Sequence, residues 1–153
     1  EARELLKHAE RLFPNHPRPV LDGATIAHYQ ENWAEAVHLW RGLQRRFPEE
    51  EKPLVWQGFA LIRMDKLDEA ESVLALACDR FPESAEAALY YADVAHRQKR
   101  WDLASERWAK VRGKFEYRLE GYERGAEALL QLGRREEAER ILASGRTIIP
   151  GRV

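Results

Sequence analysis

Residues 58–82, with the sequence GFALIRMDKLDEAESVLALACDRFP, decide the fold class. Small or apolar residues recur in this stretch at steps of three and four, on both sides of a short polar break at 63–66, which puts each set on one helix face. They are Gly58 and Leu61 before the break, and Leu67, Ala70 and Leu74 after it. The Phe81-Pro82 pair ends the second helix, because proline has no amide donor. The stretch predicts a helix–turn–helix hairpin.

The same pattern returns every 34 residues along the chain. Phe-Pro pairs stand at 13–14, 47–48 and 81–82, while the next steps fall on Phe115-Glu116, which lacks the proline, and on Ile149-Pro150. Two columns hold small residues: Ala2, Ala36, Ala70, Ala104 and Ala138, and Ala24, Gly58, Ala92 and Ala126. A third column holds bulky residues: Leu6, Trp40, Leu74, Trp108 and Leu142. Columns that share one period predict a tandem array of helical hairpins.

Composition excludes several classes of protein. The chain has 153 residues, of which 44% are hydrophobic and 33% charged, as in ordinary globular proteins. A net charge of −1 argues against nucleic-acid binding, and no apolar run is long enough to span a membrane. We expect a cytoplasmic location. Because the chain begins with Glu1 rather than Met, we also expect it to be a fragment or a processed form.

These residues resemble the tetratricopeptide repeat (TPR). The match consists of Gly58-Phe-Ala-Leu61, Lys66-Leu-Asp-Glu-Ala70 and Phe81-Pro82, and then Gly125-Ala126, Leu132-Gly-Arg-Arg-Glu-Glu-Ala138 and Pro150. The resemblance implies an all-α fold, a right-handed α-α superhelix (TPR solenoid) of antiparallel helix hairpins. It divides one domain, 1–153, into repeats 17–50, 51–84, 85–118 and 119–152, with 1–16 as the second helix of a truncated repeat.

Proteins with this repeat usually bind peptides or partner helices on a concave groove lined by the first helix of each hairpin. The repeat register assigns to that groove Leu21, Thr25, His28, Tyr29, Val55, Trp56, Phe59, Arg63, Tyr90, Asp93, His96, Arg97 and Arg124. An apolar and aromatic centre flanked by charges suits an extended peptide or an amphipathic helix. Modules that clamp the carboxylate of heat-shock chaperones carry Lys, Asn and Arg in these columns. Such a clamp is not expected, because Leu21, Val55, Leu89, Thr25, Phe59 and Asp93 stand there.

No enzyme motif and no cofactor or metal site is predicted. His28 and His96 share a column but lie two repeats apart, too far to bind one metal ion. Cys78 lies on an apolar helix stretch and is interpreted as buried filler rather than a nucleophile. The tryptophans that recur seven residues apart, Trp33 with Trp40 and Trp101 with Trp108, could form an aromatic ligand box. Core packing is the favoured interpretation.

The sequence leads to a non-enzymatic protein-interaction scaffold that binds a protein or peptide partner. Two alternatives stay open: an accessory TPR region of a larger bacterial enzyme, such as a sugar- or sulfate-transferring protein, and a homo-oligomerisation module. The last helix carries Ala138, Ile141, Leu142, Ile148 and Ile149, so we expect an uncapped C-terminal end that continues or self-associates. Basic residues outnumber acidic ones between 97 and 114. Such a run could orient a charged partner, but a solvated face is the favoured interpretation.

Overall fold

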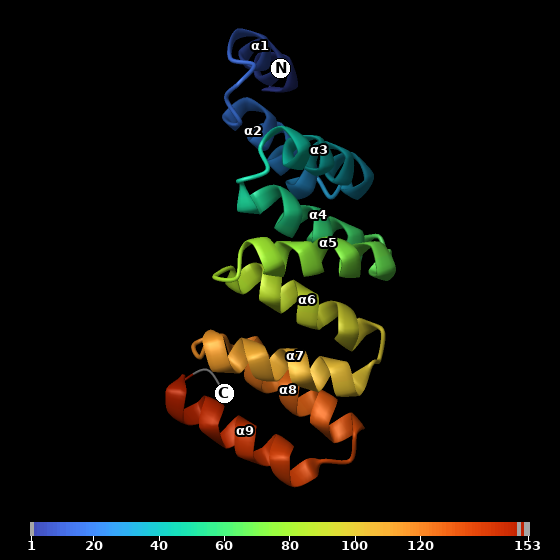
Figure 1. The fold of residues 1–153 in the computed structure, drawn as a ribbon, viewed down its shortest axis with the longest axis vertical. Coiled ribbons are helices and arrows are strands. Elements are labelled where there is room, and N and C mark those ends of the chain that lie inside the picture. Colours follow the sequence, from blue (N-terminus) through green and yellow to red (C-terminus); the bar gives the residue numbers. More distant parts are fainter. Residues whose placement is uncertain (1, 150, 152–153) are drawn as a thin grey trace. The chain divides into compact units, whose positions relative to one another are not determined.

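The computed structural model describes residues 2–149 and 151, with side chains from Glu4 onward (Figure 1). The described residues form helices joined by short turns and contain no strand. They divide into two compact units, Glu1–Ala77 and Cys78–Val153, and each is described by itself. The all-α fold of consecutive helical hairpins is confirmed. The assignment of 1–153 to one domain stays a prediction.

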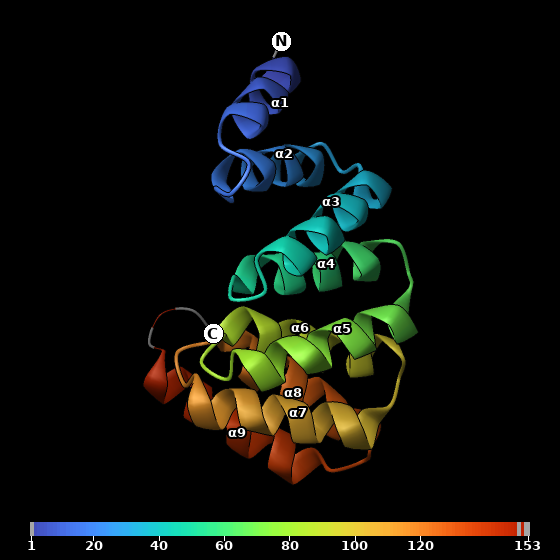
Figure 2. The ribbon, with the colours of Figure 1, turned by 45° about the horizontal axis from the view of Figure 1, so that its top comes forward.

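The first unit, residues 1–77, contains four complete helices and most of a fifth. They are α1 (Ala2–Leu12), α2 (Arg18–Tyr29), α3 (Trp33–Arg46), α4 (Glu51–Arg63) and α5 (Leu67–Arg80), which crosses into the second unit. Helix α2 packs against α1 on one side and α3 on the other, and α3 also packs against α4 (Figure 2).

The second unit, residues 78–153, begins with the last turn of α5 and continues with four helices. They are α6 (Ala85–Arg97), α7 (Trp101–Lys114), α8 (Leu119–Gln131) and α9 (Arg135–Ile148). Consecutive helices pack against each other, and α6 also contacts α8, so that successive hairpins stack within the unit (Figure 1).

The turn inside each hairpin has the same backbone conformation in all four repeats. A positive φ occurs at Glu31 (55°), Asp65 (58°), Lys99 (57°) and Gly133 (74°). The next amide donates to a carbonyl five residues earlier, as from Arg134 N to Leu129 O at 2.9 Å, and this bond satisfies a carbonyl at the helix end. A one-residue left-handed reversal therefore sets the direction of each second helix.

The turn between hairpins follows a phenylalanine whether or not proline comes next. Phe47 has φ −133° and ψ 70°, and Phe115, which precedes Glu116, has φ −123° and ψ 64°. The amide of Phe115 donates to Val111 O at 2.7 Å, as Phe47 donates to Leu43 O at 2.8 Å. The missing proline in the third repeat thus leaves the turn unchanged. Pro150 lies outside the described residues.

Small and bulky columns form the core of both units. The alanines of the two small columns are at most 2% exposed, and Gly58 is also buried. Ala2 is left out, because its side chain lies outside the described part. A Cβ built on Gly58 would lie 2.5 Å from Cγ and Cδ2 of Leu74. Trp40, Leu74 and Trp108 fill the space opposite the small residues and are likewise at most 2% exposed. Close helix approach thus depends on small side chains at these positions.

The apolar residues at the two ends differ in their exposure. Of the apolar residues near the N-terminus, Leu6 and Ala9 are half-buried, whereas Leu5, Leu12 and Phe13 are 60–66% exposed. Helix α1 packs against α2 and so covers one face of the first hairpin. At the other end Ala138 is buried, and Ile141, Leu142, Ile148 and Ile149 are half-buried rather than exposed.

Candidate partner-binding site

An aromatic cluster, formed by His28, Trp33, Trp56 and Phe59, lies in the first unit. The ring of His28 is at its centre, 4.8 Å from Trp56 and 5.1 Å from both Phe59 and Trp33 between centroids. Phe59 also lies 5.8 Å from Trp33 and 5.9 Å from Trp56. All four residues are half-buried, so the cluster is ordered by its own contacts and remains accessible. Most of these contacts are edge-to-face, which is a favourable geometry for aromatic rings.

Three helices bring the aromatic cluster together. His28 is in the last turn of α2, and Trp33 is the first residue of α3, just beyond the left-handed turn at Glu31. The turn places the two rings edge to face, with an interplanar angle of 88°. Trp56 and Phe59 are three residues apart on α4 and therefore lie on one helix face. The site thus depends on the first hairpin and on the first helix of the next.

The centre of the aromatic cluster is apolar, because burial disfavours a charge on His28. Burial lowers the pKa of His28 below its ordinary value, because an imidazolium ion would lose hydration among the aromatic rings. The Nδ1 atom of His28 has no hydrogen-bond partner among the described residues. At the edge, the guanidinium of Arg63 lies 5.4 Å from the centroid of the Trp33 ring, and Tyr29 is 82% exposed. A neutral aromatic centre therefore has a cationic and phenolic border.

The other predicted residues of the first unit lie in two environments. Leu21 and Thr25 are half-buried on α2, and the Thr25 hydroxyl donates to Leu21 O at 2.7 Å. Val55 is only 2% exposed and belongs to the core. The prediction that Val55 lines an accessible groove is therefore wrong, because its methyl groups are not on the surface.

In the second unit the residue that corresponds to His28 is His96, which is 7% exposed. It lies at the centre of a polar network. Trp108 Nε1 donates to Nδ1 of His96 at 3.3 Å, and Nε2 of His96 lies 3.3 Å from Oε2 of Glu127. Since Nδ1 accepts, the neutral ring carries its proton on Nε2 and donates it to the carboxylate. Arg124 Nη1 also contacts Oε2 of Glu127, at 3.0 Å. Burial opposes the charged form, but hydrogen bonds from Arg124 and His96 keep the pKa of Glu127 below its usual range.

The remaining predicted residues of the second unit belong to charged pairs or are partly buried. Arg97 Nε contacts Asp93 Oδ2 at 2.6 Å across one helical turn of α6. Tyr90 is half-buried, and its pKa is raised first by burial and then by the charge of Glu86. The face of α6 and α8 is therefore ionic where the face of α2 and α4 is aromatic.

The tryptophans divide into two structural roles. Trp40 and Trp108 are 1% and 2% exposed, which confirms core packing for these two. Trp33 and Trp101 are half-buried and lie against His28 and His96, with centroid distances of 5.1 and 5.0 Å. The sequence interpretation assigned both to the core. Trp101 does pack against the core around Trp108, whereas Trp33 belongs to the aromatic cluster. The available signal was the histidine five residues before each of them, since His28 with Trp33 repeats as His96 with Trp101.

Other kinds of site find little support in the described part of the chain. No group of three or more His, Cys, Asp or Glu side chains there could hold a metal ion. No helix among the described residues is both long and apolar enough to cross a membrane. Burial raises the pKa of the Cys78 thiol to about 11, although the charge of Arg107 opposes the shift.

Helix order, turn geometry and packing define a helical-repeat fold of the TPR type, and comparison with solved structures confirms it. The structure of YrrB, described as a TPR protein with an unusual peptide-binding site, matches with a TM-score of 0.80 at 16% sequence identity, over 98% of this chain and 77% of that one. A structure of MamA matches with a TM-score of 0.86 at 16% identity, over 95% and 85% of the two chains.

MamA from Desulfovibrio magneticus RS-1 matches with a TM-score of 0.84 at 14% identity, over 95% of this chain and 82% of that one. No model of a protein family matches the chain, and no curated protein matches it by sequence. At these identities the likeness establishes the fold, and the chemistry of the site must come from this chain's own residues.

Proposed function

We propose that this chain is a non-enzymatic protein-interaction scaffold. It binds a peptide or partner helix on the surface formed by the first helix of each hairpin. The aromatic cluster carries the proposal, because it joins accessible tryptophan and phenylalanine rings to an arginine at their edge. Trp, Tyr and Arg dominate the energetics of protein interfaces. YrrB, a TPR protein of similar fold, is described as having a peptide-binding site.

The contacts within the aromatic cluster favour binding in two ways. Rings held by edge-to-face contacts lose little conformational freedom when a partner arrives, so less of the interaction energy is spent on ordering them. The desolvated His28 stays neutral near pH 7, which keeps the centre apolar. We infer that apolar partner side chains contact Trp56 and Phe59, and that an acidic group lies near Arg63.

The ionic face of α6 and α8 contributes selectivity rather than affinity. Its charges are already paired, as Asp93 with Arg97 and Glu127 with Arg124. Exposed pairs of this kind add little affinity, but they reject partners of the wrong charge pattern. We infer that Tyr90, Asp93, Arg97 and Arg124 contribute selectivity, while His96 holds their surface in place.

Truncation of the aromatic cluster tests the proposal. A peptide is first selected from a displayed library on the wild-type chain, and its Kd is then measured with Trp56→Ala and Phe59→Ala. We expect a loss of about 2 kcal/mol in binding free energy for at least one variant, because central aromatic residues act as hot spots. Tyr117→Ala is the matched control, since Tyr117 is 74% exposed on the second unit and outside the predicted face. Equal affinity in all variants would refute the assignment.

A further inference from the structure

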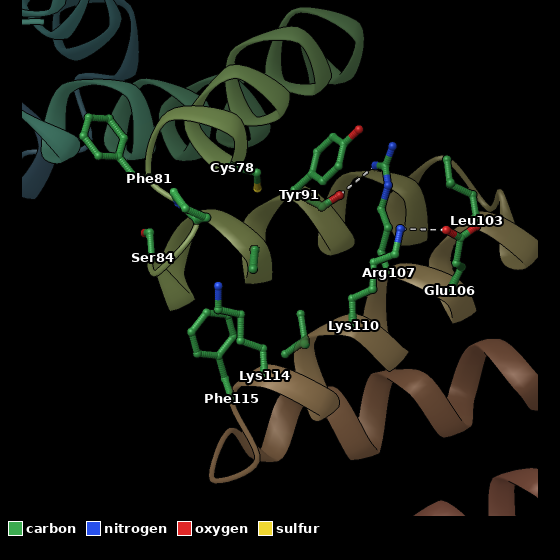
Figure 3. Close-up of a pocket in the computed structure, with 13 residues that line it drawn as sticks. Cys78, Phe81, Ser84, Tyr91, Leu103, Glu106, Arg107, Lys110, Lys114 and Phe115 are labelled. Atoms are coloured by element: carbon green, nitrogen blue, oxygen red, sulfur yellow. Dashed lines mark hydrogen bonds and ion pairs between the residues drawn. The ribbon is translucent and has the colours of Figure 1, made fainter. Parts of the chain in front are cut away.

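The second unit contains a cavity of about 390 Å³ that the proposed function does not use (Figure 3). The end of α5, the turn after it, α6 and α7 supply its walls. Its lining is mainly apolar, and includes Phe81, Ala88, Leu103, Val111 and Phe115. None of its residues belongs to the predicted partner-binding face. A cavity of this size accommodates a large side chain or a small ligand.

Positive charge surrounds this apolar space. Arg107, Lys110 and Lys114 line the cavity, whereas Glu106 is the one acidic residue in its lining. Arg107 is 8% exposed and is held in place by Tyr91, whose carbonyl accepts from Nη1 at 2.9 Å and whose ring centroid lies 3.5 Å from the guanidinium carbon. The cavity therefore has a fixed cation in its wall (Figure 3).

The two lysines form exposed and replaceable ion pairs. Lys110 Nζ contacts Glu106 Oε1 at 2.8 Å, with the side chains 74% and 60% exposed. Lys114 Nζ contacts Glu83 Oε1 at 2.8 Å, and the Glu83 side chain is 85% exposed. Pairs so open to water contribute little and exchange readily for another carboxylate. Both ammonium groups are thus available to an incoming anion.

We propose that this cavity is a second binding site, which takes one large apolar side chain from an acidic segment of a partner protein. The apolar side chain enters between Phe81, Leu103 and Phe115, and the neighbouring carboxylates of the segment contact Lys110 and Lys114. A peptide fits this arrangement because the apolar surface lies inside the cavity and the exchangeable charges lie at its rim. One side chain of a bound peptide can fill the cavity while the neighbouring residues of the same peptide contact the rim.

The sole cysteine of the chain supplies a local readout. Cys78 lines the cavity and is half-buried, so a bound side chain covers it. Its pKa of about 11 means that alkylation is slow at neutral pH and measurable under alkaline conditions. Protection of Cys78 from alkylation, measured at that residue by peptide mass spectrometry, therefore reports occupancy of this cavity.

The test uses synthetic fluorescent peptides in which aspartate and glutamate flank a central Phe-Leu pair. One matched peptide replaces the acidic residues with lysine, and another replaces Phe-Leu with serine. We expect only the acidic apolar peptide to bind and to slow Cys78 alkylation. Binding should weaken about threefold to tenfold in the Lys110→Gln/Lys114→Gln double variant, because two rim charges are lost. The double variant Arg135→Gln/Arg146→Gln, on exposed positions of α9 outside the cavity, removes the same charge and should bind normally.

A filling variant separates this site from the aromatic cluster. Ala88→Trp should occupy the cavity and abolish binding of the acidic peptide, with circular dichroism confirming that the variant folds. Trp56→Ala should leave this binding unchanged, so the two sites succeed or fail separately. The proposal is overturned if the acidic apolar peptide fails to bind at millimolar concentration. It is equally overturned if binding persists in the lysine double variant at full strength, or if Cys78 is alkylated at the same rate with and without peptide.

Discussion

At the scale of single residues, two substitutions between repeats separate the two histidine environments. His28 and His96 occupy the same column, and each lies edge to face against a tryptophan. The next repeat presents Trp56 and Phe59 to His28. The same two columns hold Arg124 and Glu127 beside His96. A carboxylate gives His96 a hydrogen-bond acceptor, whereas a phenyl ring excludes water from His28 and offers none.

This difference predicts a pH dependence for the first unit. The folded pKa of His28 lies below its ordinary value of 6.5, so the unfolded chain binds more protons at that position. The contribution of neutral His28 to stability is therefore complete above about pH 6.5 and is lost as the pH falls toward the folded pKa. Thermal denaturation of wild type and His28→Gln over this range is the measurement. The difference between their Tm values should change with pH, and a constant difference would contradict the prediction.

At the scale of elements, the left-handed turn determines where each second helix begins. Three of the four turns carry a residue with a side chain at the positive-φ position, and only the last has glycine. A Cβ at such a position clashes with the following carbonyl, at a cost of about 1 kcal/mol. Tertiary packing of the hairpins offsets that cost, because the turn also satisfies a carbonyl at the helix end.

Exchange of residues at the turns tests this account. Lys99→Gly should raise the free energy of unfolding by about 0.5–1 kcal/mol, because glycine adopts a positive φ without strain. Gly133→Ala, the reciprocal change at the equivalent turn, should lower it by about 1 kcal/mol. Urea denaturation measures both. Opposite signs are required, and a loss of stability in Lys99→Gly would show that the lysine side chain makes a contact worth more than the strain.

At the scale of the whole molecule, we propose that the hairpins form one cooperative domain over 1–153. In repeat proteins each hairpin depends on its neighbours, so damage to one unit lowers the stability of the next. Gly58→Ala is a suitable perturbation, because the added Cβ would lie 2.5 Å from atoms of the buried Leu74. We expect a loss of about 1–3 kcal/mol from overpacking.

Hydrogen exchange and thermal unfolding give the readout. One transition shifted to lower temperature, with reduced protection in α4 and also in α8, is the result expected for a continuous domain. Gly42→Ala is the control, since no atom lies within 4 Å of its added Cβ, and it should stabilise α3 by up to about 1 kcal/mol. Two separate transitions, of which only one responds to Gly58→Ala, would show that the units are independent.

The sequence by itself determined the fold. The 34-residue period placed every hairpin, because helix formation and close packing depend on which positions are small, bulky or polar, and these are local properties of the repeat. The turn after Phe115 was left open by the sequence, because the following proline is missing, and the structure has the same helix end there as at Phe47.

The tertiary structure decided which side chains share a site. Register alone placed Val55 on the surface and Trp33 in the core, whereas packing buries Val55 and sets Trp33 against His28 and Phe59. The cavity beside Arg107 has no sequence signature at all. Such features depend on contacts between helices, where a shift of a few ångströms moves a side chain from solvent to core. No periodicity within one helix encodes that position.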